Sequence, residues 1–286
     1  MLKCIVRNET GFELQLTHNE NMFKVTNISG LEPPKMAIYS SNVYTLAGEV
    51  FNYAKDEKRN IVIEMYLVND VAYDIHQLVT AFKTSQKITL IFDDTFMIDG
   101  YVETLEYNEF DEQVACQVSV MCLYPYFLSA NTQSDSFLGL ESLFEFPFSL
   151  PQQGKSFGNL RENPNTEITV NNTGMQTGCR IELYFNDNAT NIEFKNITNN
   201  SELIIHRDFW LGETLIVDFT GVNKIVMLNG KNIIGDVLPT NNFLYLSSGT
   251  NRITYKVEQG LNYNNIDITY NTCYTYVDTM SERDII

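Results

Sequence analysis

Apolar and polar residues alternate along most of the chain, and this alternation predicts short β-strands joined by turns. The N-terminal stretch holds three candidate strands, at residues 2–6, 12–16 and 23–28, with Gly-containing or Asn-containing turns between them. Residues 58–70 predict a further strand, in which the positions on both faces are mostly apolar. One face carries Ile61, Ile63, Met65 and Leu67, and the other carries Val62, Tyr66 and Val68, with Glu64 as the exception. We expect both faces of this strand to be buried.

One segment has helical rather than strand periodicity. Its apolar residues recur at spacings of three and four and follow two good helix N-caps, Asn69 and Asp70. These apolar residues are Val71, Ile75, Leu78, Val79 and Phe82. The spacing predicts a single amphipathic helix, followed by strands at residues 87–94, 96–107 and 113–127. A strand–helix–strand unit within a mostly β region indicates an α+β domain.

The composition changes in the middle of the chain, and we place a domain boundary there. Residues 129–165 are rich in Ser, Asn, Gln, Pro and Gly, and the chain beyond them is predicted to hold only strands and turns. The apolar residues expected to point inward there are Ile181, Leu183, Phe185, Leu215, Val217, Phe219, Ile253, Tyr255, Val257, Ile266, Ile268 and Tyr270. Regular short strands with a polar opposite face predict a β-sandwich. The sequence is therefore divided into an α+β domain at residues 1–130 and an all-β domain at residues 131–286.

Composition and charge exclude several classes of function. The chain has 286 residues, of which 44% are apolar, and this is enough for a packed core. It carries 19 Lys and Arg against 36 Asp and Glu, and the resulting net charge of −17 repels nucleic-acid phosphates and anionic lipid heads. The first residues do not resemble a signal peptide, and no run approaches the ~18 apolar residues of a membrane span. We expect a soluble protein that is made in the cytoplasm and does not bind membranes.

The residue types that bind metals or perform catalysis show no recognisable pattern. The five cysteines include no C-x-x-C pair, and Cys116 and Cys122 lie on an apolar strand face, where we expect core residues. The three histidines lie far apart without ligand spacing, so we expect no zinc site and no cofactor. The Asp pair at 93–94 is interpreted as a β-turn rather than a calcium loop, and the Asn-Gly pair at 229–230 as a hairpin turn. We expect no enzymatic activity.

Trp210, the single tryptophan, allows two interpretations. It lies in the segment HRDFWLGE, just before a Gly turn. In one interpretation Phe209, Trp210 and Leu211 plug one end of the sandwich, because large aromatic side chains are mostly buried. In the other, Trp210 stacks on a sugar ring, since aromatic faces bind apolar ring faces. His206 and Arg207 are close in sequence, so the second interpretation gives a candidate sugar contact formed by His206, Arg207 and Trp210.

A stiff corner interrupts the N-terminal strands. The stretch ISGLEPPKMAIYSSN places Pro33 and Pro34 between two strand-like runs. Proline lacks a backbone N–H and holds φ at about −65°, so neither residue fits inside a central strand. The corner is stiff and has a reduced capacity for edge pairing.

Several motifs, in order, resemble one known family, the phage distal tail proteins or siphovirus-type tail components. In the first half these motifs are ISGLEPP, KRNIVIEMYLV, IDGYVETLEYNEF and VSVMCLYPYF. In the second half they are KIVMLNGKNI and then FLYLSSGTNRITYKVEQGLNYNNIDITY. The stretch LAGEVFNYAKDEKRN departs from the family pattern, with Ala47-Gly48 where the family often has Asp-Gly. The resemblance implies a split-barrel-like first domain with one helix and a galectin-like β-sandwich as second domain.

The resemblance also implies a structural role in the phage virion. In this family the first domain assembles into a hexameric ring at the tail tip, which continues the tail tube and leaves a channel for DNA. The second domain docks tail-tip, tail-associated or receptor-binding proteins. DNA is then expected to pass without specific binding, which negatively charged walls favour. Pro33 and Pro34 become candidate ring contacts, at the base of an arm that reaches the next subunit.

Two other functions stay open on the residues alone. The first is recognition of host cell-wall sugars by the second domain, although a galectin-like fold does not by itself define a function. The order of His206, Arg207 and Trp210 does not match a galectin-type sugar motif. The second is a tail-associated hydrolase, for which no two carboxylates are marked as a catalytic pair.

Overall fold

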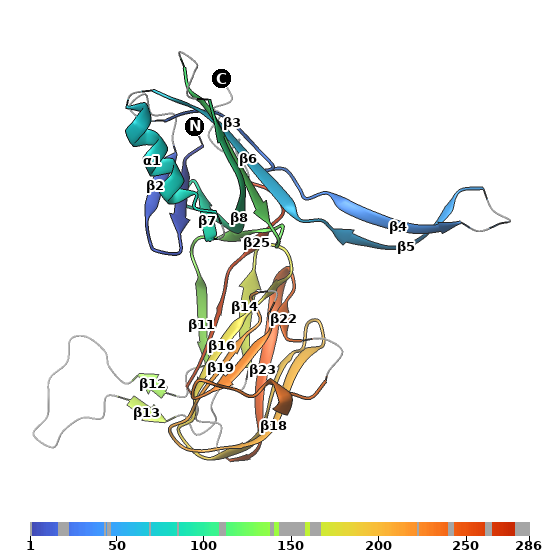
Figure 1. Ribbon diagram of the computed structural model, residues 1–286. Helices are drawn as coiled ribbons and strands as arrows, with labels where there is room; N and C mark the ends of the chain where they lie inside the picture. Colours follow the sequence, from blue (N-terminus) through green and yellow to red (C-terminus); the bar gives the residue numbers. More distant parts are fainter. Residues whose placement is uncertain are drawn as a thin grey trace, which may run out of the picture. The chain divides into compact units, whose positions relative to one another are not determined.

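The computed structural model consists of two compact units (Figure 1). The first unit comprises Met1–Asn131 and Cys273–Ile286, and the second comprises Thr132–Thr272. The structure describes residues 2–16, 23–42, 44, 47–68, 70–84, 86–108, 113–137, 140–142, 158–160, 167–221, 223–239, 243–260 and 265–277. Within these residues the chain is mainly β, with one α-helix.

The first unit is built on one antiparallel sheet, in the strand order β2-β1-β7-β8-β9-β6-β3. Its strands are β1 (Cys4–Asn8), β2 (Glu13–Leu16), β3 (Phe23–Ser29), β6 (Arg59–Leu67), β7 (Lys87–Phe92), β8 (Phe96–Tyr107), β9 (Ala115–Cys122), β10 (Phe127–Ser129) and β25 (Cys273–Tyr274). The two outermost strands, β2 and β3, contact each other, so the sheet curls into a barrel-like shape. The short strand β10 pairs with both β8 and β25.

The predicted helix is confirmed as α1 (Val71–Ala81), which lies against β1 and β2 (Figure 1). Asp70 caps it, since its carboxylate accepts a hydrogen bond of 3.2 Å from the N–H of Tyr73. Leu78 and Phe82 are buried in the core of the first unit. The helix therefore covers one part of the barrel, while the sheet supplies most of the core.

Strand β6 is buried on one face only. Ile61 and Ile63 are fully buried, but Tyr66 and Val68, on the opposite face, are 38% and 43% exposed. The expectation that both faces of this strand are buried is therefore wrong. The sheet is antiparallel, and antiparallel sheets often keep one face in solvent, even where apolar residues occupy some of its positions.

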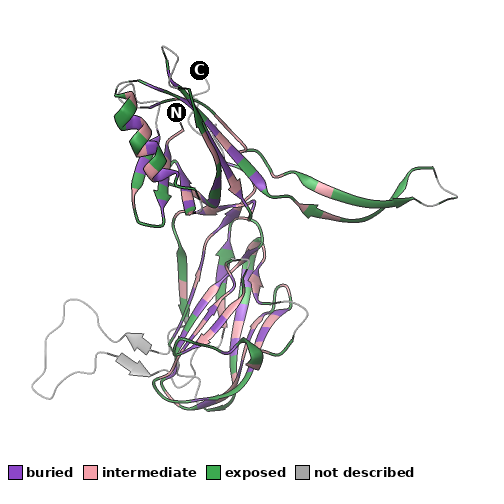
Figure 2. Ribbon diagram, in the orientation of Figure 1, coloured by how far each residue is buried: buried purple, intermediate pink, exposed green. Residues whose placement is uncertain are grey.

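Between β3 and β6 the chain forms a two-stranded arm, β4 (Met36–Asn42) and β5 (Glu49–Asp56) (Figure 1). These two strands form a sheet of their own, and the backbone N–H of Glu57 closes it by donating to the carbonyl of Lys35 at 2.8 Å. Most of the arm is exposed (Figure 2). The sequence indicated the strand-like run after the Pro-Pro corner but not the returning strand β5.

The second unit is a sandwich of two main antiparallel sheets. One sheet has the order β11-β24-β16-β19-β20-β21, and its strands are β11 (Gln133–Phe137), β16 (Arg180–Tyr184), β19 (Thr214–Asp218), β20 (Ile225–Leu228), β21 (Lys231–Asn232) and β24 (Asn265–Tyr270). The other has the order β14-β23-β17-β18, with β14 (Glu167–Asn172), β17 (Ala189–Asn196), β18 (Ser201–Phe209) and β23 (Gly249–Gly260). Shorter elements are β12 (Leu140–Ser142), β13 (Gly158–Leu160), β15 (Thr177–Gly178), β22 (Tyr245–Leu246) and the 3₁₀ helix η1 (Ile234–Asp236).

Both sheets of the second unit contribute to a single core, as the alternation predicted. Of the twelve residues expected to point inward, all are buried except Val257, which is partly buried against the same core. Phe194 and Tyr255 contact each other across neighbouring strands with ring centroids 4.9 Å apart. The predicted sandwich is confirmed, and its likeness to galectins stays a prediction.

The chain leaves the first unit after β10 and returns to it at β25, and these two strands pair with each other. The sequence-based division assigned everything after residue 130 to the second domain. The structure instead groups the chain from Cys273 onward with the first unit. Two paired residues carry too little alternation to reveal this return from sequence. The separate roles expected for the two domains stay predictions.

Two predicted turns are confirmed by their backbone conformation. Asp93 and Asp94, between β7 and β8, both have positive φ, at 47° and 52°. Asn229 and Gly230, between β20 and β21, have φ of 48° and 78°. Positive φ at both central residues is the signature of the two-residue hairpin turn that matches the twist of antiparallel strands.

Candidate functional site

The arm exposes large apolar side chains on both of its faces. The register pairs Ser40 with Phe51, which places Phe51 on the same face as Met36 and Ile38. These three side chains are 63%, 57% and 67% exposed, respectively. An isolated two-stranded hairpin is marginally stable in water, and exposed apolar patches of this kind mark interaction surfaces. The arm is therefore the leading candidate for a functional surface.

The opposite face of the arm carries a pair of stacked aromatic rings. Tyr39 and Tyr53 are register partners, and their ring centroids lie 4.5 Å apart with an interplanar angle of 18°. The two side chains cover each other and still remain about half exposed. Tyrosine is enriched in protein interfaces because it offers a large, rigid surface with one polar end. Both faces of the arm thus present side chains typical of protein contacts.

The stiff corner lies between the core and the arm, as the sequence suggested. Pro33 and Pro34 join β3 to β4; Pro33 is exposed and Pro34 is half-buried. Just before the corner, Gly30 has a φ of +87°. A Cβ atom at Gly30 would lie 2.1 Å from the carbonyl oxygen of Asn60, so the chain entering the arm and the chain leaving it approach closely only with glycine here. A role of Pro33 and Pro34 in subunit contacts stays a prediction.

The arm root is held by a buried arginine. Arg59 is the first residue of β6 and is 5% exposed. Its guanidinium donates to the carbonyls of Gly30 and Glu32, on the chain that enters the arm. It also donates to the carbonyls of Pro125 and Thr275, both at 2.7 Å. Burial lowers the pKa of Arg59 from its usual value, while nearby Cys122 and Glu32 oppose that change.

One aromatic ring packs on this arginine, and another side chain of the same motif binds the end of the arm. The guanidinium carbon lies 4.6 Å from the centre of the Phe127 ring, a cation–π distance. The hydroxyl of Tyr126 donates to the carboxylate of Asp56, the last residue of the arm. Burial, together with this hydrogen bond, raises the pKa of Tyr126 to about 12, so the hydroxyl remains a donor at neutral pH. The YPYF motif thus packs around the arm root.

A cavity of about 670 Å³ opens beside the arm root. Its lining includes Pro33, Pro34, Lys35, Lys58, Met121 and Leu123. Leu123 is 64% exposed there. The mixture of apolar and charged groups is typical of protein interfaces, which combine an apolar centre with a polar rim. The exposed surface of the arm therefore continues onto the barrel.

Carboxylates gather on the outer face of the barrel sheet. Glu64 and Glu106 both pair in register with Gln117 on β9, so they flank the same position on one face. Glu103 lies on a bulge of β8, and its carboxylate accepts a hydrogen bond of 3.1 Å from Ser119. Within the described residues, none of these three glutamates forms an ion pair. The face therefore carries three carboxylates that are not paired with a cation among the described residues.

Trp210 is 61% exposed and Leu211 is 66% exposed, so the interpretation that they plug the sandwich is wrong. Only Phe209 is buried, and its ring stacks on that of Phe185 at 4.5 Å. Two hydrogen bonds brace the turn that carries Trp210. The backbone N–H of Trp210 donates to the Glu213 carboxylate at 2.9 Å, and the backbone N–H of Leu211 donates to the Asn188 side chain at 2.9 Å. A rigid turn therefore displays an exposed indole.

The structure separates Arg207 from the other two residues of the candidate sugar contact. They are adjacent on β18, and neighbouring residues of a strand point to opposite faces. Arg207 forms an ion pair of 2.9 Å with Asp236 of η1. Trp210 lies beyond the end of the strand. Trp210 is an exposed aromatic, Arg207 is paired with Asp236, and the sugar contact of His206, Arg207 and Trp210 stays a prediction.

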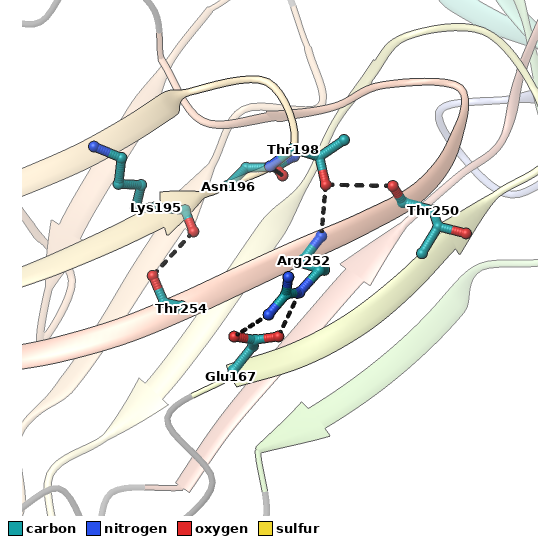
Figure 3. A network of polar contacts seen from close by, with 7 residues as sticks. All are labelled: Glu167, Lys195, Asn196, Thr198, Thr250, Arg252 and Thr254. Carbon is teal, nitrogen blue, oxygen red and sulfur yellow. Dashed lines mark hydrogen bonds and ion pairs between the residues drawn. The ribbon is translucent and has the colours of Figure 1, made fainter.

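A polar network covers part of the outer face of the second unit (Figure 3). Arg252 on β23 donates two hydrogen bonds to the Glu167 carboxylate on β14, at 2.7 and 3.0 Å. The N–H of Arg252 donates to Thr198, and Thr198 in turn donates to the carbonyl of Thr250. The hydrogen bond from Arg252 lowers the pKa of Glu167. These groups bind one another across strands, as expected for the solvated face of a sheet.

Within the described residues, no cluster of three or more His, Cys, Asp or Glu side chains is placed to hold a metal ion. In the same part of the chain, no helix is long and apolar enough to cross a membrane. Cys116 and Cys122 are buried, as predicted for core residues. Burial raises the pKa of Cys116 to about 11 and that of Cys122 to about 12, so both thiols stay protonated.

Comparison with known families now identifies part of the chain. Residues 172–274 match the family described as the siphovirus-type tail component, C-terminal domain. Over these residues the chain is similar to the siphovirus-type tail components, and the resemblance noted in the sequence is confirmed. No curated protein matches the chain.

Comparison with solved structures found chains that are similar to this one. The Dit protein (gp 19.1) of phage SPP1, described as a paradigm of the hub adsorption apparatus in phages that infect Gram-positive bacteria, is 15% identical to this chain. The match has a TM-score of 0.65 and covers 94% of this chain and 98% of that one. A chain of the phage p2 baseplate in its activated conformation with Sr is 7% identical, with a TM-score of 0.49 and the same coverage. The first of these likenesses shows the two-unit fold.

Sequence reasoning missed two functional features, and for one of them a signal was present. Arg59 falls on the inward positions of its strand, in phase with Ile61 and Ile63. A charged residue in phase with a buried face indicates a satisfied buried cation, and this pattern was available in the sequence. The second feature is strand β5, which the sequence analysis did not assign.

Proposed function

We propose that this protein is a structural component of a phage tail tip or baseplate, in which copies join through the arm into a hexameric ring. The observation that carries the proposal is the arm, a ribbon with exposed apolar side chains on both faces. The match of residues 172–274 to the tail component family and the fold shared with the hub protein of phage SPP1 support it. A heterologous contact, in which one surface of each copy binds a different surface of the next, generates closed rings. The arm and the barrel supply two such different surfaces.

The carboxylates on the barrel support the second part of the proposal, that the ring surrounds a channel for DNA. Glu64, Glu103 and Glu106 share one outer face of the sheet without ion-pair partners among the described residues. We assign this face to the channel. Negative walls repel phosphates, so DNA would slide past without specific binding. If the negative charge served solubility alone, the carboxylates would not need to lie on one face.

The proposal assigns the protein to the virion and gives it no catalytic activity. The ring would join the tail tube protein on one side and tail-tip or tail-associated proteins on the other. The second unit would dock receptor-binding proteins or other baseplate parts. The similar SPP1 protein is described as a hub of the adsorption apparatus, and this supports such partners by analogy.

A substitution in the arm tests the ring. Phe51→Ser removes an apolar side chain that is 63% exposed, so the monomer should keep its stability and lose most of its self-association. Leu211→Ser is the matched control, because Leu211 is 66% exposed in the second unit. Sedimentation velocity over a range of concentrations measures both. Self-association that survives Phe51→Ser unchanged, or that Leu211→Ser weakens equally, contradicts a contact through the arm.

A second candidate function, binding of host cell-wall sugars, is favoured by one observation, the exposed indole of Trp210 on its braced turn. Aromatic faces stack on sugar rings, and a rigid turn lowers the entropy cost of such a contact. Co-sedimentation with purified cell walls tests it. Binding that Trp210→Ala abolishes and Leu211→Ala preserves supports the sugar site. Absence of binding by the unmodified protein removes this candidate.

A further inference from the structure

The root of the arm and the two connections to the second unit meet at one side chain, that of Arg59. Its guanidinium binds Gly30 and Glu32, on the chain that enters the arm. It also binds Pro125, shortly before β10, and Thr275, shortly after β25. The last acceptor lies 216 residues away in sequence. Arg59 therefore holds together three segments that the chain order keeps far apart.

We propose that Arg59 is a positioning residue that couples the root of the arm to the two segments through which the second unit is attached. A displacement of either attachment segment would then be transmitted to the root of the arm, and a displacement of the arm to the attachment segments. This inference concerns the first unit alone and does not rest on the proposed ring.

The chemistry of the network explains why the three segments depend on one another. A guanidinium holds its N–H donors in a rigid planar fork, so it can satisfy several carbonyls only when they keep fixed directions. The four acceptors of Arg59 among the described residues are all backbone carbonyls, and within these residues no carboxylate takes part. A buried cation that loses a partner is strongly unfavourable. When one segment moves, the arginine must either follow it or lose its hydrogen bond.

Contacts next to Arg59 reinforce the same arrangement. The N–H of Val277 donates to the carbonyl of Leu31 at 3.1 Å, which fixes the returning chain to the entry of the arm. Tyr126, beside Pro125, binds Asp56 at the end of the arm. Each attachment segment therefore touches the arm root directly as well as through the arginine. Within the described residues, the Arg59 guanidinium is the one group that binds all three segments.

Hydrogen exchange measured by mass spectrometry on the full chain tests the coupling, with Arg59→Met and Arg59→Lys as variants. In Arg59→Met we expect exchange to become at least about tenfold faster in residues 30–35, 124–127 and 273–277 together, since charged hydrogen bonds are lost in all three. Arg59→Lys keeps the positive charge but loses the planar fork of N–H donors. We therefore expect an increase in exchange rate in the same segments that is smaller than in Arg59→Met. Arg7→Met, which removes a surface ion pair with Glu13 on the same sheet, is the matched control.

Three results would overturn the proposal. An increase confined to one segment would make Arg59 a local brace. An equal increase throughout the first unit, including β1 and β2, would mean general loss of stability. Complete restoration by Arg59→Lys would show that charge alone suffices and that the fork does not link the segments. If Arg59→Met fails to fold, the pattern in Arg59→Lys decides between the same outcomes.

Discussion

The hairpin that begins as β3 and ends as β6 has two halves with opposite environments. In the half on the barrel, Ile61 and Ile63 occupy alternate positions of β6 and are fully buried. In the arm, Ile38 and Phe51 occur in a similar alternation and are more than 60% exposed. The backbone pairing is antiparallel in both halves. The difference teaches that alternation of apolar residues specifies a strand. Whether those residues are buried depends on whether another part of the same chain packs against that strand.

The largest effect expected from this comparison is on stability. Ile63→Ala should lower the free energy of unfolding by about 2–5 kcal/mol, because it leaves a cavity in the barrel core. Ile38→Ala should change it by less than about 0.5 kcal/mol, because the side chain is already in water. Urea unfolding of the two variants measures both values. Equal losses would mean that the arm side chain is covered within the monomer.

The next effect concerns the junction of the two halves. Gly30→Ala should destabilise the first unit by about 1–3 kcal/mol, since its Cβ would clash with the backbone of Asn60. Gly11→Ala is the control, because Gly11 also has positive φ, at 83°, but open space around it. Thermal unfolding compares them. A similar loss in both variants would show that the backbone conformation alone, without the close approach, sets the cost.

The third effect should appear in assembly and leave folding unchanged. Replacing Pro33 and Pro34 by Ala removes the stiffness of the corner, so the arm would sample more directions and lose more entropy on binding a neighbour. We expect a folded monomer whose self-association is weakened severalfold, measured by sedimentation velocity. Pro239→Ala, at an exposed position in the second unit, serves as control. Unchanged self-association would leave the corner without a role in the ring.

The smallest effect on stability is expected on the solvent-exposed face of the second unit. Glu167→Gln breaks the exposed pair with Arg252, and exposed pairs contribute little, so the melting temperature at neutral pH should stay the same within error. The pKa of Glu167 is lowered in the folded protein. Any stabilisation by this pair is therefore present above the unfolded pKa and disappears as pH falls through the folded pKa. A clear loss of stability at neutral pH would indicate that the network in Figure 3 has a larger structural role.

Much of the fold could be predicted because it follows from local patterns. The helix after Asp70, the inward residues of the sandwich and the hairpin turns each depend on a few neighbouring residues. The return of the chain at Cys273 could not be predicted, because strand pairing between β10 and β25 joins positions far apart in sequence. The same reason hid the Arg59 network, whose acceptors are backbone carbonyls available at any position.

The candidate site was predicted only in part. Pro33 and Pro34 were recognised as a corner because proline restricts the backbone locally. The exposure of the arm could not be read from the sequence, since Phe51 and Tyr53 alternate as core residues do. The grouping of His206, Arg207 and Trp210 stays a prediction, although the strand geometry separates Arg207 from His206. Sequence proximity ignores that adjacent strand residues face opposite ways.

The measurement that tests the account most directly is negative-stain electron microscopy of the concentrated protein and of Phe51→Ser, prepared identically. The account predicts hexameric rings with a central hole for the unmodified chain and dispersed particles for the variant. Rings in both samples would contradict a contact through the arm. An unmodified protein that stays monomeric at every concentration would contradict self-assembly through this surface.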